Sequence, residues 1–267
     1  MPKCKGCGKF RLFFQLDGDG FCKDCVAKNA LAKRVAYLKA LEDAAKEELD
    51  SLPRYPITLS SQKLAHRLVA DLDDIKFSNI TPKGTYNEFV VFDTETTGLS
   101  ASRDKIIELA AVHFVNGHPI EVFETFVNPG RSIPAEATKV NHITDEMLAD
   151  APTIAQVLPC FDAFVGKSAV VAHNLAFDLK FVHHAGSAII DTKRKYYCTY
   201  EQSKKMVKGP KYKYGEADYS NCDVDDYKLG TLCEYYNITI PGQHRAAADA
   251  IATGKLFLAL IDEKQSK

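Results

Sequence analysis

Apolar runs alternate with helical patterns over the C-terminal two thirds of the chain. Four runs have the length and composition of β-strands, at residues 89–92, 106–114, 122–127 and 168–172. The first of them, Phe89–Phe92, is apolar at every position, which predicts a central strand covered on both faces. Apolar residues recur at spacings of three and four in segments that we predict to be helices, at about 153–165, 176–186, 199–207, 228–236 and 245–262. Strands alternating with helices indicate an α/β domain, which we place at residues 86–262.

The preceding region, residues 29–80, has a helical pattern of its own. An amphipathic helix is predicted by the apolar residues Leu31, Val35, Leu38, Leu41, Ala45 and Leu49, which lie among charged ones. Pro53 and Pro56 end it. A second pattern follows at Leu64, Leu68, Leu72 and Ile75, and residues 76–87 are typical of a linker. We interpret the region as a helical connector. Its apolar stripe is expected to pack within a helical hairpin or against the neighbouring domain. The less favoured alternative is that the stripe binds a partner protein.

Composition and charge narrow the class of protein. Hydrophobic residues make up 46% and charged residues 26% of the chain, as in ordinary globular proteins. The formal net charge of −1 argues against binding nucleic acid by bulk charge, although it leaves room for a local basic patch. No stretch approaches the roughly 18 apolar residues of a membrane helix, and the first residues do not resemble a signal peptide. We therefore expect a cytoplasmic protein without membrane partners.

Four of the eight cysteines lie close together near the start. Cys4-x-x-Cys7 is followed after fourteen residues by Cys22-x-x-Cys25, a spacing that predicts one bound Zn²⁺. A strand at residues 9–16 and a turn at 17–20 between the two pairs suggest a zinc-ribbon or treble-clef module over residues 1–28. A redox role for the CxxC pairs is the weaker alternative, because two matched pairs face each other. DNA binding, partner docking and structural capping are all open as the role of this module.

The segment FDTETTGL, residues 92–99, contains the first candidate site. Asp93 and Glu95 follow a buried strand, and side chains two apart on a strand point to the same face. Two neighbouring carboxylates resist ionisation unless a cation compensates them, and Mg²⁺ or Mn²⁺ accept such oxygen ligands. Alone, an acidic pair at a strand end is more often a solvated loop.

Two later segments add candidate residues to this pair. Asp178 lies in the first turn of a predicted helix within HNLAFDLKFV, where an acid could also serve only the helix dipole. His244 and Asp249 lie in HRAAADAIATGKLF. The alanines around Asp249 would let this helix approach the sheet closely; the alternative is a packed alanine helix with an exposed acid.

In order and spacing, these three segments resemble the motifs of the DEDDh (DnaQ-like) 3′→5′ exonucleases, a family that includes the proofreading epsilon subunit of bacterial DNA polymerase III. The resemblance covers about residues 88–260 and is supported by RDKIIELAAV (103–112), VNHITDEML (140–148) and YKLGTLCEYYNI (227–238). One departure is Asn141-His142, where relatives commonly have His-Gly. The resemblance implies an RNase H-like mixed sheet flanked by helices.

The resemblance also implies a reaction. Two Mg²⁺ or Mn²⁺ ions would be held by Asp93, Glu95, Asp178 and Asp249, with Asp93 bridging both ions. His244 would be the general base that deprotonates the attacking water, as suits an imidazole near neutral pH. The product would be a nucleoside 5′-monophosphate. Glu108, in an apolar strand, is either a group close to the metals or a strand-edge acid.

Substrate contacts are expected mainly from the loop after the first motif. The candidate residues are Thr96, Thr97, Gly98, Leu99, Asn174 and Phe181, with helix packing as an equal alternative for Phe181. Residues 191–215 hold eight basic and two acidic residues among five tyrosines, a composition that suits a single strand or, equally, a solvated loop.

Together these features predict an exonuclease acting on single-stranded DNA 3′ ends, in replication, repair or proofreading. RNA is the less favoured substrate, and an exoribonuclease in RNA processing is one alternative function. A polymerase-associated nucleic-acid-binding adaptor is the other. Because the chain shows no polymerase domain, proofreading would require a polymerase or other replication protein, which the N-terminal module could recruit.

Overall fold

The computed structural model describes residues 3–7, 9, 21–59, 72, 75–80, 86–213, 216–242 and 244–266. The chain forms two compact units, Met1–Lys46 and Glu47–Lys267. Almost all of the strand and turn predicted at residues 9–20 lies outside the described residues, as does most of the second connector helix predicted around 64–75. Neither prediction is therefore tested.

A five-stranded mixed sheet forms the centre of the second unit. Its strands stand in the order β3 (His118–Phe126), β2 (Ile106–Val115), β1 (Glu88–Thr96), β4 (Ala169–Ala172) and β5 (Tyr196–Cys198). β1 pairs with β2 and β2 with β3 in antiparallel fashion, whereas β1–β4 and β4–β5 are parallel pairs. β1 is the central strand, as its apolar sequence predicted.

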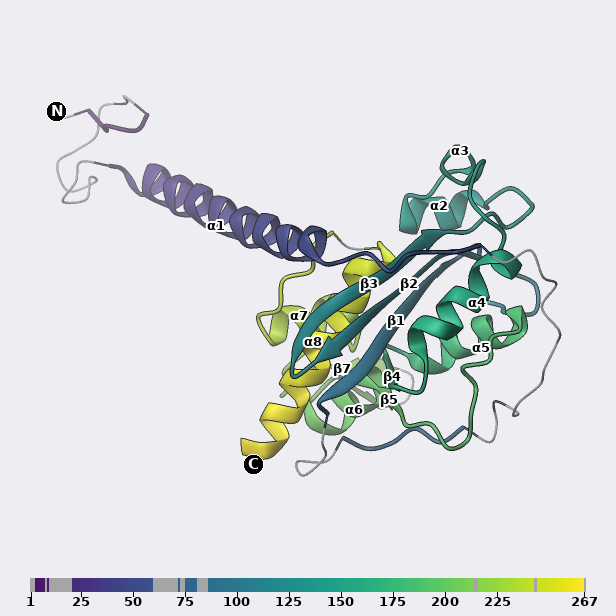
Figure 1. Ribbon diagram of the computed structural model, residues 1–267. Helices are drawn as coiled ribbons and strands as arrows, with labels where there is room; N and C mark the ends of the chain where they lie inside the picture. Colours follow the sequence, from purple (N-terminus) through teal and green to yellow (C-terminus); the bar gives the residue numbers. More distant parts are fainter. Residues whose placement is uncertain are drawn as a thin grey trace. The chain divides into compact units, whose positions relative to one another are not determined.

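Helices cover both faces of this sheet (Figure 1). One face packs against α4 (Ile154–Val165) and α5 (Leu175–Ala185), and the other packs against α8 (Ala246–Ser266). α6 (Thr199–Met206) and α7 (Leu229–Tyr235) lie on the side of α8. Along β1, Phe89 and Val91 point to α8, and Val90 and Phe92 point to α4 and α5. This alternation decides which helix each later residue of β1 faces.

Four short elements of the second unit were not predicted: α2 (Ala135–Asn141), α3 (Asp145–Leu148), and the hairpin strands β6 (Lys211–Lys213) and β7 (Glu216–Asp218). Each spans seven residues or fewer, and none has the apolar run or apolar stripe from which the equally short β4 and α7 were predicted. β5 was not predicted either.

α1 (Lys23–Ser51) contains the predicted amphipathic helix and ends before Pro53, as expected. Near its end, Leu49 is buried in the core of the second unit, and Glu48 forms an ion pair with Lys255 of α8. Leu31 and Val35, on the predicted apolar stripe, are more than half exposed. Their predicted hairpin partner falls largely on residues outside the description, so the role of the stripe stays open. Among the described helices, none combines the length and apolar character needed to cross a membrane.

α8 lies very close to the sheet because its contact face consists of small residues. Its alanines at 246, 247, 248, 250 and 252 are all buried. At Gly254, an added Cβ would lie 2.3 Å from the Cζ atom of Phe114 on β2. The small side chains therefore set the distance between α8 and β2, as the sequence suggested.

The substitution Gly254→Ala is expected to lower the free energy of unfolding by about 1–3 kcal/mol, the usual cost of overpacking a core. Helix propensity alone would change it by about 1 kcal/mol in the opposite direction. Urea denaturation measures the sign of the change in the free energy of unfolding. Introducing Phe114→Leu as well should recover much of the loss, whereas a more stable Gly254→Ala variant would contradict this packing.

Candidate active site and cysteine cluster

The end of β1 places two carboxylates on the side of α8. Asp93 and Glu95 continue the alternation of Phe89 and Val91, and both are half-buried. Glu95 stands directly opposite Glu108 in the register of β1 and β2. The strand geometry that the sequence predicted for Asp93 and Glu95 is confirmed.

Asp178 comes from the first turn of α5 and is buried. Its Oδ1 atom accepts hydrogen bonds from the backbone N–H of Thr94, at 3.1 Å, and from the Thr94 hydroxyl, at 2.7 Å. Thr94 thus ties Asp178 to the strand between the other two acids. Thr94 was not singled out from the sequence, although its place between Asp93 and Glu95 in the first motif is visible there.

The start of α8 supplies the remaining two predicted residues. His244 has a left-handed backbone conformation, with φ of 61°, and its N–H donates to Asp249 Oδ2 at 3.2 Å. Ligand atoms of Glu95, His244 and Asp249 all lie within 4.8 Å of one another. The charges of Asp178, Asp249 and Glu95 all act on Asp93. The structure therefore brings the five residues of the three motifs together.

These carboxylates resist ionisation. Burial, followed by the charges of Asp178 and Asp249, raises the pKa of Asp93 well above its ordinary value. Burial and the charge of Asp249 raise the pKa of Glu95 to about 8. Burial likewise raises the pKa values of Asp178 and Asp249 to about 7. A set of crowded carboxylates beside one imidazole fits hard divalent cations such as Mg²⁺ or Mn²⁺.

Asn141 belongs to this site, although the sequence marked it only as a departure from the family pattern. Its side chain is buried at the end of α2 and forms a hydrogen bond with Glu95 that favours the charged carboxylate. Its Oδ1 atom accepts the N–H of Ile143 at 3.1 Å. The next residue, His142, has φ of 59°, in the region that glycine adopts without strain. The loop therefore contacts the site through Asn141.

Glu108 is buried close to the acidic cluster and forms an ion pair with Arg245 at 2.8 Å. Of the two interpretations open from the sequence, the structure supports a group close to the site. Arg245 was not predicted, and its only signal in the sequence is its position beside His244.

The predicted nucleotide-binding loop is held by its own contacts. The backbone N–H of Thr97 donates to the carbonyl of Lys105 at 2.9 Å, so this N–H is not available to a nucleotide. The Thr97 hydroxyl accepts hydrogen bonds from the Lys105 N–H and from Arg131. At Gly98, an added Cβ would lie 2.5 Å from Asp104 Oδ2, and the Thr96 hydroxyl donates to the Gly98 carbonyl. The Leu99 side chain is 88% exposed and so accessible to a ligand.

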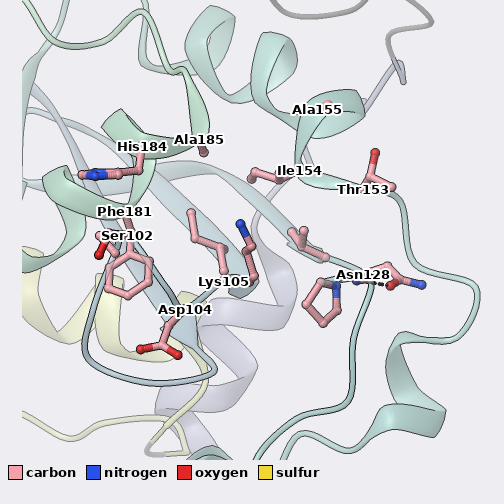
Figure 2. A pocket seen from close by; sticks show the side chains of 15 residues that line it. Ser102, Asp104, Lys105, Asn128, Thr153, Ile154, Ala155, Phe181, His184 and Ala185 are labelled. Atoms are coloured by element: carbon pink, nitrogen blue, oxygen red, sulfur yellow. Dashed lines mark hydrogen bonds between the residues drawn. The ribbon is translucent and has the colours of Figure 1, made fainter.

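Asn174 precedes α5, and Phe181 lies within it. Asn174 is exposed in a left-handed conformation immediately before the helix. Phe181 is buried, packs against Phe177, and lines a cavity of about 380 Å³. Figure 2 shows Phe181 and His184 on one side of this cavity, near Ser102 and Asp104, with Asn128 and Ile154 across from them. Of the six predicted substrate contacts, Phe181 alone lines it.

The basic stretch at 191–215 is partly used by the fold. Arg194 donates to the carbonyls of Ser168 and Gly166, both at 2.6 Å, and Lys204 forms an ion pair with Glu201. The stretch runs through β5 and α6 into β6. A role in binding a nucleic-acid strand stays a prediction for the remaining lysines.

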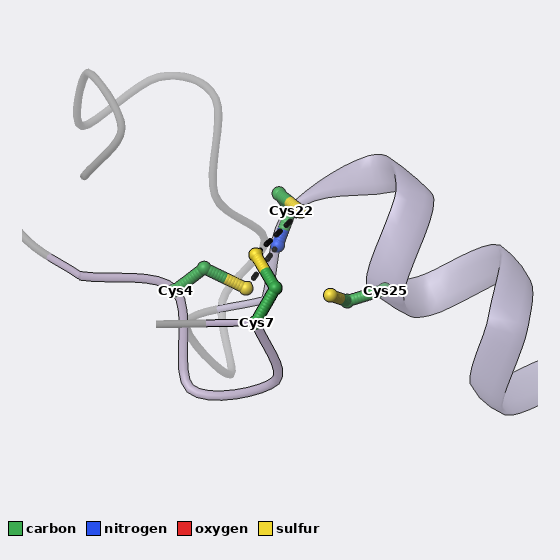
Figure 3. A group of neighbouring side chains, drawn as sticks. All are labelled: Cys4, Cys7, Cys22 and Cys25. Carbon is green, nitrogen blue, oxygen red and sulfur yellow. Dashed lines mark hydrogen bonds between the residues drawn. The ribbon is translucent and has the colours of Figure 1, made fainter. Parts of the chain in front are cut away.

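In the first unit, the four N-terminal cysteines converge as predicted. All four sulfurs lie within 4.8 Å of one another, and those of Cys7 and Cys22 are 4.0 Å apart. Figure 3 shows Cys25 approaching the other three from the first turn of α1. A tetrahedral Zn²⁺ with Zn–S bonds of about 2.3 Å would place its sulfurs roughly 3.8 Å apart, so the cluster fits that ion.

Backbone contacts also prepare this cluster for a thiolate. Hydrogen bonds from the backbone of Cys7 and Cys22 lower the pKa of Cys4 to about 6. The pKa of Cys25 is raised to about 12 by the hydrogen bond between the Cys25 and Cys4 side chains. A Cβ at Gly6 would lie 2.9 Å from the Cys25 sulfur, so a larger residue there would crowd the cluster. Of the other cysteines, Cys198 and Cys233 are buried within the second unit.

A mixed sheet flanked by helices, with acidic residues at the end of its central strand, defines an RNase H-like nuclease fold. Residues 90–257 match the RNase_T family model, described as exonuclease, and the chain belongs to this family. Its domain is thus that of a 3′→5′ exonuclease, a phosphodiester hydrolase.

Two curated relatives illustrate the similarity. The chain is 37% identical over 179 residues to a DNA polymerase III PolC-type protein of Caldanaerobacter subterraneus subsp. tengcongensis, an alignment that covers 67% of this chain and 12% of that protein. It is 39% identical over 186 residues to a DNA polymerase III subunit epsilon-like protein of Rhodobacter capsulatus, with 65% of this chain and 23% of that protein covered. The chain therefore matches only a minor part of these relatives.

Among solved structures, the fold is similar to that of E. coli Exonuclease I in complex with a dT13 oligonucleotide. The TM-score is 0.50 and the sequence identity 17%, with 67% of this chain and 42% of that chain covered. At this identity the likeness concerns the fold.

Proposed function

We propose that residues 86–262 remove nucleotides one at a time from the 3′ ends of single-stranded DNA, with two divalent cations held by Asp93, Glu95, Asp178 and Asp249. The convergence of these four carboxylates with His244 in a member of an exonuclease family is the observation that carries the proposal. Bound there, the cations would neutralise the scissile phosphate and polarise the attacking water.

The residues of the chain have separate parts in this reaction. A ring nitrogen of His244 takes the proton of the attacking water, because His244 is exposed beside Glu95 and Asp249. Its N–H bond to Asp249 holds the backbone in place. Thr94 and Asn141 fix Asp178 and Glu95, so that the carboxylates keep their positions when the substrate binds. The terminal nucleotide lies against the loop at residues 96–99, with Leu99 beside its base.

DNA is favoured over RNA because the relatives are named as parts of DNA polymerase III, and because the similar fold of Exonuclease I binds a dT13 oligonucleotide. We propose a role in replication, repair or proofreading, and the names of these relatives support replication. An exoribonuclease is the alternative that a substrate experiment must separate.

Matched single-stranded DNA and RNA of one sequence, with the corresponding DNA duplex, test the substrate in the presence of Mg²⁺ or Mn²⁺. We expect the highest kcat/KM on single-stranded DNA. Faster degradation of RNA would assign the chain to RNA processing, and binding without degradation of any of the three would support a nucleic-acid-binding adaptor.

For the N-terminal module, we propose one structural Zn²⁺ held by Cys4, Cys7, Cys22 and Cys25. The measurement is metal content after exhaustive dialysis, with an expected value of about one zinc per chain. The variant Cys22→Ser/Cys25→Ser should lose the zinc, whereas Cys160→Ser should keep it. Less than half an equivalent in the unmodified chain would refute the site.

The charge of the chain suggests what this module does. Residues 1–46 contain ten lysines and arginines against five aspartates and glutamates, a net charge of +5, so the remainder carries −6. On α1, Lys28, Lys33, Arg34 and Lys39 are all exposed. Because the substrate is a polyanion, we propose that the first unit adds a second contact with the nucleic acid. Recruitment of a polymerase is the alternative.

The double substitution Lys33→Glu/Lys39→Glu is expected to weaken binding of long single-stranded DNA and to reduce the dependence of log K on log salt by about 1.4, the value for two lost phosphate contacts. Turnover of a dinucleotide should be unchanged. Fluorescence anisotropy at several salt concentrations measures binding, with Lys139→Glu/Lys167→Glu as the matched control. Equal binding by the two variants would leave partner recruitment as the better account.

A further inference from the structure

Three residues form a row across the sheet beside the acidic cluster. In the registers of β1, β2 and β3, Glu95 stands opposite Glu108, and Glu108 stands opposite Phe126. The alternation along the strands places the row on the face covered by α8. Two carboxylates directly opposite each other destabilise a sheet unless their charges are compensated. Glu108 has no exposed surface, so its compensation must come from within the protein.

Both oxygens of Glu108 are used by the segment that begins α8. Oε1 accepts hydrogen bonds from Arg245 Nε at 3.0 Å and Nη2 at 2.8 Å, and Oε2 accepts the N–H of Ala246 at 3.1 Å. The guanidinium lies over the ring of Phe126, 5.1 Å from its centroid, and its Nη2 is 3.6 Å from Glu124 Oε1. Arg245 thus joins the start of α8 to β2 and β3.

This junction carries two residues of the proposed site. His244 precedes Arg245 directly, and the Asp249 backbone N–H donates to the carbonyl of Arg245 at 3.0 Å. Two N–H groups of Arg245 on one oxygen and a helix N–H on the other hold this carboxylate, which leaves little rotational freedom at this junction. A shift of Arg245 would move both the base and a carboxylate of the site.

We propose that Glu108 and Arg245 are positioning residues for the reaction, an inference that rests on the proposed function. Their pair anchors the start of α8, and it occupies Glu108 so that this carboxylate does not act as a further metal ligand. Glu95, on the opposite strand, has Asn141 rather than an arginine as its hydrogen-bond partner and so remains available to a cation.

The two single substitutions are expected to change metal affinity in opposite directions. Arg245→Gln leaves the buried Glu108 carboxylate unpaired beside Glu95, so it should tighten Mn²⁺ binding about tenfold. Glu108→Gln leaves the Arg245 guanidinium unpaired, so it should weaken Mn²⁺ binding about tenfold. Both values are in keeping with the coupling of close buried charges. Both substitutions should lower kcat more than they change KM, because the base is displaced. Glu108→Gln/Arg245→Gln should bind Mn²⁺ nearly as the unmodified chain does.

Calorimetric titration of the metal-free full-length chain with Mn²⁺ tests this, with circular dichroism as a check on folding. Arg245→Lys keeps the charge without the fork, so its Mn²⁺ affinity should stay normal while kcat falls. Lys204→Gln, which breaks the ion pair with Glu201 on α6, is the control and should leave Mn²⁺ binding unchanged.

A purely structural role predicts that both single substitutions weaken Mn²⁺ binding and that the double one weakens it further. That result would overturn the inference while leaving the proposed function intact. If the unmodified chain binds no Mn²⁺ at all, the proposed function itself fails.

Discussion

Replacing Asp93 with asparagine is expected to lower the rate of exonuclease cleavage by about 10³-fold or more. Metal ions supply several kcal/mol of charge stabilisation in such reactions, and each 1.36 kcal/mol is a factor of ten in rate. The charges of four other carboxylates act on Asp93, which lies at the centre of the cluster: Asp178, Asp249, Glu95 and Glu108. Loss of Asp93 should therefore affect every metal position at once.

The same substitution should stabilise the metal-free protein at pH 8, because it removes a buried carboxylate that resists ionisation. Single-turnover cleavage and thermal unfolding of the same preparations measure the two effects. Asp150→Asn, at an exposed position, is the matched control and should change neither. Activity within tenfold of the unmodified chain would remove Asp93 from the site.

The stability of the metal-free chain is expected to fall as the pH rises from 6.5 to 9. The pKa of Glu95 is raised to about 8, and those of Asp178 and Asp249 to about 7. Groups whose pKa is higher in the folded than in the unfolded state stabilise the fold at low pH, and this contribution is lost as the pH rises through the folded values. The loss therefore begins near the unfolded pKa values of about 4 and is complete near pH 9, and between pH 6.5 and 9 it continues mainly through Glu95.

A divalent cation should reverse this loss, because it compensates the ionised carboxylates. A net effect of about 2 kcal/mol corresponds to a shift of roughly 4–8 °C in the unfolding temperature of a domain of this size. Burial lowers the pKa of His173 to about 4, so this group mainly affects stability at lower pH.

Thermal unfolding at pH 6.5 and 9, with and without Mn²⁺, measures the effect. The metal should stabilise the protein more at pH 9 than at pH 6.5, and Asp93→Asn should reduce the difference. A metal-free chain that is equally stable or more stable at pH 9 would contradict the described electrostatics.

Local sequence pattern was enough to predict the central features of the exonuclease unit. The unbroken apolar run Phe89–Phe92 predicted a strand buried on both faces, and the two-residue period of a strand placed Asp93 and Glu95 on one face. The alanines around Asp249 predicted that α8 packs closely on the sheet, which the buried face of α8 confirms. Periodicity and residue size are local properties, so they can be read without knowing the fold.

Contacts between distant segments could not be predicted in this way. Asn141 reaches Glu95 because α2 ends beside β1, and α2 itself has no apolar stripe from which it could be predicted. Arg245 binds Glu108 across 137 positions of sequence, and Arg131 reaches Asp104 across 27. An arginine in a sequence does not specify which carboxylate it will meet, since topology brings the two together.

One measurement tests directly whether this cluster is a metal-dependent 3′→5′ exonuclease centre. A single-stranded DNA labelled at its 5′ end is incubated with the full-length chain, with Mg²⁺ or with a chelator, and the products are separated by length. We predict a ladder of labelled fragments shortened one nucleotide at a time, which the chelator and Asp93→Asn both abolish. Immediate release of a labelled mononucleotide, or an unshortened strand in Mg²⁺, would show that the cluster is not a 3′→5′ exonuclease centre.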